Sequence, residues 1–241
     1  MMQDLTNQVV LVSGGSSGIG LGIANAFADQ GAKVAISSRS EGTLKEVAAD
    51  RQLLTRACDV GNLDDVKDLI AWTESELGPI GILVISAGTN VPKRLYENTS
   101  PEDFEAVIRT NTIGAFNLFH TILPGMRARK SGTIFNIVSI AGIQNTILAG
   151  TPYCASKFAQ KSLGQFANLE ALPDGVRCTN IYPGETNTGI IDKRPVVPAD
   201  EDRAKMVQPE DVGALAVTIA KLPPRACVPD ITVTPPYMPM V

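Results

Sequence analysis

Short apolar runs rich in β-branched residues alternate along the chain with longer amphipathic stretches. The apolar runs predict strands over residues 8–13, 33–37, 55–59, 82–86, 132–139, 177–182 and 231–234. The amphipathic stretches predict helices over residues 18–30, 41–53, 63–77, 101–128, 152–171 and 209–220. Because strands that alternate with helices form parallel βαβ units, we expect an α/β fold with a doubly wound, mainly parallel sheet and helices on both faces.

The alternation of strands and helices continues from residue 8 almost to the end of the chain, with no Gly/Ser/Pro-rich linker. It therefore predicts one Rossmann-type domain over residues 1–241 with a seven-stranded sheet. The longest stretch without a predicted element is 184–207, which contains Pro195 and Pro198. Because a long irregular segment in a compact domain is commonly functional, we expect this segment to be a mobile lid over the substrate.

Composition limits the classes of function. Hydrophobic residues make up 44% and charged residues 19% of the chain, and the net charge of -4 argues against a nucleic-acid partner. The segment Met1–Gln8 has no Lys or Arg, and the apolar run after it is too short for a signal peptide or a membrane span, so we expect a cytoplasmic protein without a membrane partner. The four cysteines lack C-x-x-C spacing and His120 is the only histidine, so no metal site is expected.

A glycine-rich segment follows the first predicted strand directly and opens the first predicted helix. Glycines let a backbone come close to a pyrophosphate, whose charge is met by the free N–H groups and the dipole of the helix. The strand before and the helix after distinguish this segment from an ordinary glycine turn. We expect it to bind a dinucleotide through Gly14, Ser16, Ser17, Gly18, Ile19 and Gly20.

The end of the second predicted strand reads Ser37-Ser38-Arg39-Ser40. A carboxylate at this place would bind the ribose 2′-hydroxyl of NAD and repel the 2′-phosphate of NADP. No carboxylate is present, and the Arg39 guanidinium can pair with a phosphate. The sequence therefore favours NADP(H) over NAD(H), with Ser38 and Arg39 as contacts, although Arg39 as a merely solvated loop charge remains the alternative.

Tyr153 and Lys157 lie at positions i and i+4 of a predicted helix, so both side chains project from one face. A phenol with a pKa of about 10 is a poor base at neutral pH, and a nearby ammonium lowers that pKa. Ser139 ends the strand before this helix, at the edge where open α/β sheets bind their ligands. Asn111 lies within a predicted helix, where an amide is unfavourable unless it has a role. We expect Tyr153 to exchange a proton with a substrate oxygen.

The spacing of Gly14, Gly18 and Gly20, together with Asn111, Ser139, Tyr153 and Lys157 in this order, resembles the classical short-chain dehydrogenase/reductase family over nearly the whole chain. The resemblance implies that Ser139 binds the substrate oxygen and that Tyr153 is the acid in reduction and the base in oxidation. It also implies that Lys157 holds the nicotinamide ribose and lowers the pKa of Tyr153, and that Asn111 anchors a water in a proton relay.

The same resemblance implies further cofactor contacts along the edge of the sheet. Asp59 and Val60 would approach the adenine, and Ala87 and Gly88 would pass close to the cofactor. Near the nicotinamide carboxamide it implies Pro183, Gly184, Thr186 and Thr188, with Thr188 favoured over Thr186 by its spacing from the Pro-Gly pair.

Two places depart from the family pattern. Ile85-Ser86 stands where the family usually has Asn-Asn before Ala-Gly, so the polar support of the central sheet must come from Ser86 or be missing. The interval from Ser139 to Tyr153 is about one residue longer than the family pattern implies, which predicts an altered substrate wall over residues 143–151.

These observations predict an NADP(H)-dependent oxidoreductase that acts on a small carbonyl compound or secondary alcohol. One alternative is a 3-oxoacyl-thioester reductase of a fatty-acid or polyketide type pathway, which the Pro-rich ending at residues 234–241 disfavours. A second alternative is a non-catalytic NADP(H) sensor, which would have little need of four catalytic residues. The family resemblance also implies a homodimer or homotetramer built on the long helices.

Overall fold

Seven parallel strands form a single sheet in the computed structural model, which describes residues 2–49 and 51–238. The strand order is β3-β2-β1-β4-β5-β6-β7. The strands are β1 (Val9–Ser13), β2 (Lys33–Ser38), β3 (Leu53–Ala57), β4 (Ile82–Ile85), β5 (Gly132–Ile137), β6 (Val176–Pro183) and β7 (Asp230–Val233). Each neighbouring pair is parallel, so the predicted doubly wound sheet is confirmed.

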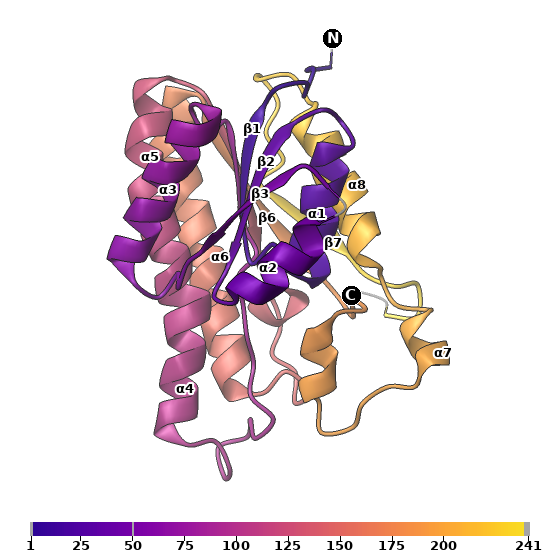
Figure 1. Ribbon diagram of the computed structural model, residues 1–241. Coiled ribbons are helices and arrows are strands. Elements are labelled where there is room, and N and C mark those ends of the chain that lie inside the picture. Colours follow the sequence, from indigo (N-terminus) through magenta and orange to yellow (C-terminus); the bar gives the residue numbers. More distant parts are fainter. Residues whose placement is uncertain (1, 50, 239–241) are drawn as a thin grey trace.

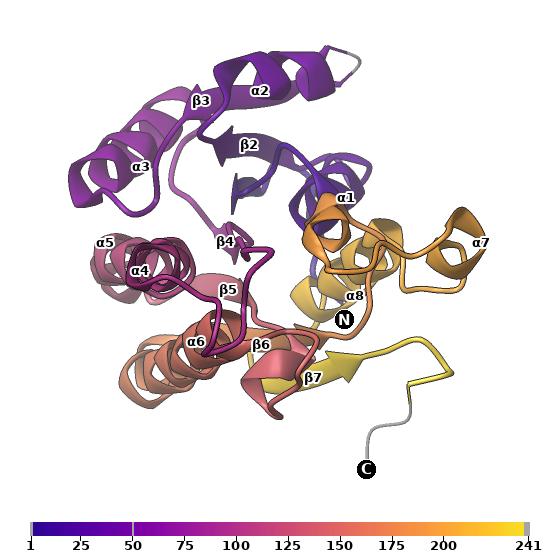
Figure 2. The ribbon, with the colours of Figure 1, turned by 90° about the horizontal axis from the view of Figure 1, so that it is seen from below.

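Helices cover both faces of the sheet (Figure 1). On one face lie α1 (Gly18–Ala28), α2 (Glu41–Ala48) and α8 (Pro209–Ala220), and on the other lie α3 (Leu63–Leu77), α5 (Gly114–Ala128) and α6 (Thr151–Ala171). Figure 2 shows these layers from below. One core packs around Phe27 and Phe135, and the second, on the opposite face, packs around Leu83 and Leu118.

The strands β1, β4, β5 and β6 are buried along their whole length, β2 is buried except at its two ends, and the edge strands β3 and β7 are only partly covered. Two covered faces require apolar side chains on both sides of a strand, which explains the continuous apolar runs in the sequence. None of the described helices is both long enough and apolar enough to cross a membrane.

Two predicted helices differ from the structure. The helix expected over 41–53 ends at Ala48, and Leu53 begins β3 instead, with position 50 outside the described residues. Leu53 is buried against the sheet and pairs with Val34, so tertiary burial decides its conformation. The helix expected over 101–128 is α4 (Pro101–Ile108) and α5, separated by a π-helical turn at Arg109–Ile113. Such turns are frequent at functional sites.

The segment 184–207 is partly ordered into short elements. It contains a 3₁₀ helix (Gly189–Lys193) and α7 (Asp200–Arg203), and a parallel bridge between Thr186 and Val207 joins its two ends. In Figure 1 this orange segment lies at the lower end of the sheet. At the C-terminal end the description stops at Met238, so the last three residues of the Pro-rich ending lie outside the described residues.

Candidate functional site

A cavity of about 710 Å³ lies at the carboxyl ends of the strands. It runs from the loop after β1 to the start of α6 and to the segment after β6. The predicted site residues that line it are Gly14, Ser16, Ser17, Gly18, Ile19, Ser38, Arg39, Asp59, Val60, Ala87, Gly88, Ser139, Tyr153, Lys157, Pro183, Gly184, Thr186 and Thr188. Gly20 and Asn111 lie behind this lining, next to Gly14 and Thr89 respectively.

The glycine loop lies directly against the end of β4. Gly14 has φ +68°, and a Cβ on it would lie 2.7 Å from the Cα of Ala87, so no side chain fits there. Ser17 caps α1 without a side-chain hydrogen bond, and the first turn holds no acidic residue. The first N–H groups of α1 therefore lack a side-chain partner and suit the phosphates of a dinucleotide.

The far end of the cavity has a cation but no carboxylate at the tip of β2. Arg39 is exposed, and within residues 2–49 and 51–238 it makes no hydrogen bond or ion pair. Asp59 lines the cavity after β3, and its Oδ1 accepts a hydrogen bond from the Gly61 N–H at 3.0 Å. These residues leave the Arg39 guanidinium available to an anionic group.

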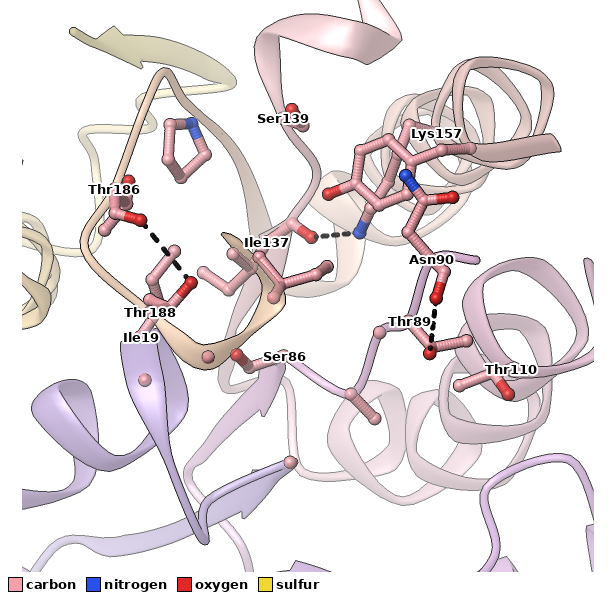
Figure 3. A pocket seen from close by; sticks show the side chains of 18 of the residues that line it. Ile19, Ser86, Thr89, Asn90, Thr110, Ile137, Ser139, Lys157, Thr186 and Thr188 are labelled. Carbon is pink, nitrogen blue, oxygen red and sulfur yellow. Dashed lines mark hydrogen bonds between the residues drawn. The ribbon is translucent and has the colours of Figure 1, made fainter. Parts of the chain in front are cut away.

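Tyr153 and Lys157 lie one turn apart at the start of α6, with Ser139 beside them. Ser139 follows the end of β5 by two residues, and its side chain lies close enough to Tyr153 to lower the pKa of the phenol. Lys157 Nζ donates to the carbonyl oxygen of Ile137 at 3.0 Å and to Gln160 Oε1 at 2.7 Å. Figure 3 shows Lys157 directed toward Ile137, and its Nζ lies 5.6 Å from the centroid of the Tyr153 ring.

Burial controls the protonation of both residues. Desolvation raises the pKa of Tyr153 to about 12, and the hydrogen bond with Ser139 acts in the opposite direction. Desolvation lowers the pKa of Lys157 to about 7. Lys157 is not among the groups that shift the pKa of Tyr153, and its ammonium donates to Ile137 and Gln160 instead. Tyr153 is a protonated phenol at neutral pH.

Asn111 lies in the π-helical turn and is fully buried. Its Oδ1 accepts from the Thr89 N–H at 2.8 Å, and its Nδ2 donates to the Thr89 carbonyl at 3.0 Å and to Ser156 Oγ at 2.9 Å. A Cβ on Gly88 would lie 3.6 Å from both Asn111 Oδ1 and Lys157 Nζ. Asn111 and Lys157 therefore flank the same glycine at the end of β4.

The polar support expected from Ser86 comes from Ser13 instead. The buried Ser13 hydroxyl donates to the Val84 carbonyl at 3.2 Å and accepts from the Ser86 N–H at 3.3 Å. Ser13 thus ties the end of β1 to the end of β4, and the Ser86 side chain faces the cavity (Figure 3).

Arg94 lines the cavity together with residues of the wall 143–151 and of the segment 184–207. Arg94 is buried and donates to the carbonyl of Leu148 at 3.0 Å and to that of Lys193. It therefore joins the wall 143–151 to the segment 184–207. Thr188 lies against the glycine loop, where a Cβ on Gly18 would come within 3.0 Å of its Cγ2.

The parallel sheet, the glycine loop and the cavity above them define a dinucleotide-binding protein of the Rossmann type. The chain belongs to the short-chain dehydrogenase/reductase family, since residues 8–195 match the family described as short chain dehydrogenase. It is therefore an oxidoreductase.

Individual relatives agree with this assignment. The chain is 35% identical over 240 residues to an uncharacterized oxidoreductase of Staphylococcus saprophyticus, covering 97% of this chain and all of the relative. The closed form of a serine dehydrogenase complexed with NADP+ has a TM-score of 0.87 at 28% identity, with 97% of each chain covered. A single-residue variant of actinorhodin polyketide ketoreductase with NADPH has a TM-score of 0.86 at 25% identity, with 98% of each chain covered.

The low pKa of Lys157 predicts a pH dependence of stability. Its pKa is about 7 in the folded protein against 10.5 for a free side chain, so between these values the unfolded chain binds more protons. The free energy of unfolding should therefore rise with pH from 7 to 8.5, by about 1 kcal/mol per pH unit. Denaturant unfolding at several pH values measures this slope.

The variant Lys157→Met should flatten that rise. The window stops at pH 8.5 because burial raises the pKa of the Cys58 and Cys178 thiols, whose unfolded forms ionise above that pH and oppose the trend. An equal slope in the variant and the parent protein would show that Lys157 is not its source.

Proposed function

We propose that this oxidoreductase transfers a hydride between NADP(H) and the carbon of a small carbonyl compound or secondary alcohol, with Tyr153 as the general acid and base. The observation that carries the proposal is the Tyr153 phenol, which lines the cavity together with Ser139 and lies one helical turn from Lys157. A proton donor and a dinucleotide cradle in one cavity suit paired proton and hydride transfer.

Each residue has a defined part in this proposal. The bound nicotinamide would supply or accept the hydride. Ser139 and Tyr153 would hold the substrate oxygen by two hydrogen bonds, and Tyr153 would give that oxygen its proton during reduction. Lys157 would bind the nicotinamide ribose through its ammonium. Asn111 would fix Thr89 and hold a relay water. Its Nδ2 donates two hydrogen bonds and its Oδ1 accepts one, so the Oδ1 can still accept a hydrogen bond from that water.

Because Tyr153 is protonated at neutral pH, the site favours reduction of a carbonyl over oxidation of an alcohol at that pH. A phenol with a pKa of about 12 holds a proton to donate. Alcohol oxidation needs the phenolate, which a cation beside the oxygen would stabilise. Lys157 can provide that cation only while it stays protonated.

NADP(H) is the proposed cofactor because Arg39, which pairs with none of the described residues, lies where the 2′-phosphate would lie. The tip of β2 has no carboxylate, so no negative charge there would repel this phosphate. The serine dehydrogenase and the polyketide ketoreductase that this chain resembles are complexed with NADP+ and NADPH. Segment 184–207 would act as the substrate lid, held shut by Arg94 through the Lys193 carbonyl.

A second copy of this chain is the proposed partner. Exposed apolar side chains gather on α4, the π-helical turn, α5 and α6, which pack together on one side of the molecule (Figure 1). They are Phe104, Ile113, Phe116, Phe158, Phe166, Leu169 and Leu172. An apolar face of this extent on paired helices suits a homodimer or homotetramer.

Tyr153→Phe tests the catalytic proposal. Removing the hydroxyl should lower turnover of aldehydes and ketones by at least about a hundredfold, the usual contribution of a general acid. The affinity for NADPH should stay nearly unchanged, because Lys157 and the glycine loop remain. Turnover is followed by NADPH absorbance and binding by fluorescence titration. Full activity in the Phe variant would refute the role, and tight NADPH binding without turnover by the parent protein on a broad panel would favour a sensor.

Arg39→Asp tests the cofactor preference. Loss of a charge-assisted contact to the 2′-phosphate should weaken NADPH binding by about tenfold or more and leave NADH binding nearly unchanged. Arg225→Asp is the matched control, because Arg225 is exposed, lies outside the cavity and gives the same change in net charge. Equal losses for NADPH and NADH would exclude a phosphate contact at Arg39.

The double variant Phe166→Asp/Leu169→Asp tests self-association. Phe166 and Leu169 are 58% and 73% exposed on α6, so charges there should disrupt an interface with little effect on the monomer. Light scattering after size-exclusion chromatography should show a lower mass than for the parent protein. Val196→Asp, at an 80% exposed site in the segment 184–207, outside these helices, should keep the parent mass. A monomeric parent protein would contradict the proposal.

A further inference from the structure

Lys157 stands at the head of a row of buried amide side chains. Gln160 lies three residues further along α6, Asn136 lies on β5 and Asn180 on β6, and all three are 0% exposed. The row ends at Asp230, the first residue of β7, which is exposed. It therefore runs from the catalytic cavity across the sheet to the protein surface.

Each member of the row donates a hydrogen bond to the next. Lys157 Nζ donates to Gln160 Oε1 at 2.7 Å, and Gln160 Nε2 donates to Asn136 Oδ1 at 2.8 Å. Asn136 Nδ2 donates to Asn180 Oδ1 at 2.8 Å, and Asn180 Nδ2 donates to Asp230 Oδ1 at 3.1 Å. Every amide thus turns its oxygen toward Lys157 and its nitrogen toward Asp230.

The carboxylate at the end sets this direction. A carboxylate only accepts hydrogen bonds, so Asn180 must offer it the NH₂ group, and the orientations of Asn136 and Gln160 follow in turn. Three backbone carbonyls require the same orientation, because Asn136 Nδ2 also donates to Gln160 O at 3.0 Å, Asn180 Nδ2 to Lys161 O at 3.3 Å and Gln160 Nε2 to Ile137 O at 3.3 Å. The reversed row would place the Gln160 NH₂ against the Lys157 ammonium.

Gly164 makes room for the row. It lies in the middle of α6, where glycine weakens a helix, and a Cβ there would come within 2.0 Å of Asn180 Oδ1 and 2.9 Å of Asn136 Nδ2. Any larger residue would separate α6 from this pair. The absence of a side chain at Gly164 therefore lets α6 pack against the amides of Asn136 and Asn180.

We propose that Gln160 is a positioning residue for Lys157, and that Asn136, Asn180 and Asp230 hold its amide oxygen against the ammonium. An oxygen that can only accept stabilises the protonated amine, which opposes the desolvation of Lys157. The oxygen also holds Nζ beside the Ile137 carbonyl. This inference rests on the proposed function, since it concerns how Lys157 keeps the charge that its role requires.

The titratable groups near the row are few. Tyr153 faces Lys157, and at the other end the Tyr182 hydroxyl donates to Asp230 Oδ1. The thiols of Cys178 and Cys227 also interact with Asp230. The three amides between the two ends do not titrate. Each one therefore fixes the orientation of the next amide and does not carry a proton.

The test is a pH titration of the Lys157 ε-carbon by NMR in the cofactor-free protein, with the signal assigned by its loss in Lys157→Arg. Gln160→Leu removes the acceptor, and the midpoint of Lys157 should fall by about one to two pH units, as expected for the loss of a hydrogen bond to a charged group. Gln160→Glu keeps an acceptor oxygen, and its midpoint should equal or exceed that of the parent protein.

Gly164→Ala tests the row at a distance. The added methyl group would displace Asn180 and Asn136 without approaching Lys157, so the midpoint should fall in the same direction by a smaller amount. This variant also keeps the proposal testable if Gln160→Leu does not fold. An unchanged midpoint in Gly164→Ala would show that Asn136, Asn180 and Asp230 do not hold Gln160.

Asn168→Leu is the matched control. Asn168 is a buried amide on the same helix that exchanges two 2.8 Å hydrogen bonds with the backbone of Cys178, outside the row. Its loss should destabilise the fold and leave the Lys157 midpoint in place. If Gln160→Leu shows the same pattern, with lower stability and an unchanged midpoint, Gln160 is only structural and the proposal is wrong.

This titration needs neither cofactor nor substrate. A failed titration test would leave the role of Tyr153 standing, whereas an active Tyr153→Phe enzyme would refute the proposed function without moving the Lys157 midpoint. The two proposals can therefore fail separately.

Discussion

The candidate site depends on the burial of one ammonium group between α6 and the central strands. Water is excluded from Lys157, which lowers its pKa to about 7, so protein oxygens must replace the lost hydration. The Ile137 carbonyl at the end of β5 is one of these oxygens. Because Ser139 follows two residues later, the strand end that satisfies Lys157 also brings a hydroxyl to Tyr153. The proposed proton donor, the cation and the hydroxyl proposed to bind the substrate are thus held by one helix-strand contact.

The parallel sheet explains how residues far apart in the sequence share one cavity. All seven strands end at the same edge, so the loops that follow them lie side by side there. The contact between Gly14 and Ala87 shows how closely two of these loops approach. The inner strands can form such an edge because helices bury both of their faces, which removes any need for polar alternation within them.

Much of this arrangement could be predicted from local patterns. The helices at Leu63–Leu77 and Pro209–Ala220 have the predicted bounds, and the sheet has the predicted number of strands. The errors arise where distant contacts decide. Burial against Val34 makes Leu53 a strand residue. The spacing of Tyr153 and Lys157 also does not reveal the desolvation that raises the pKa of Tyr153.

Two residues whose partners sequence reasoning missed share a property. Gln160 and Arg94 carry polar groups into buried places, and their partners are side-chain amides and main-chain carbonyls from other elements. A signal for Gln160 was present, because it lies three residues after Lys157 on the same face of the helix. Such a polar residue on a buried stripe needs a partner, but the sequence does not show which one.

The substitution of the usual Asn-Asn by Ile85-Ser86 shows what the edge of the sheet requires. An asparagine at the end of β4 can bridge neighbouring strands through its amide, and here Ser13 makes that bridge from β1. Its hydroxyl donates to the Val84 carbonyl, and the Ser86 N–H donates both to this hydroxyl and to the Ser13 backbone carbonyl, so one residue of β1 holds the end of β4. The fold needs hydrogen-bond partners for the backbone at the end of β4, and different residues can supply them. Ile85 is then free to be fully apolar, and it packs into the core beside Leu83.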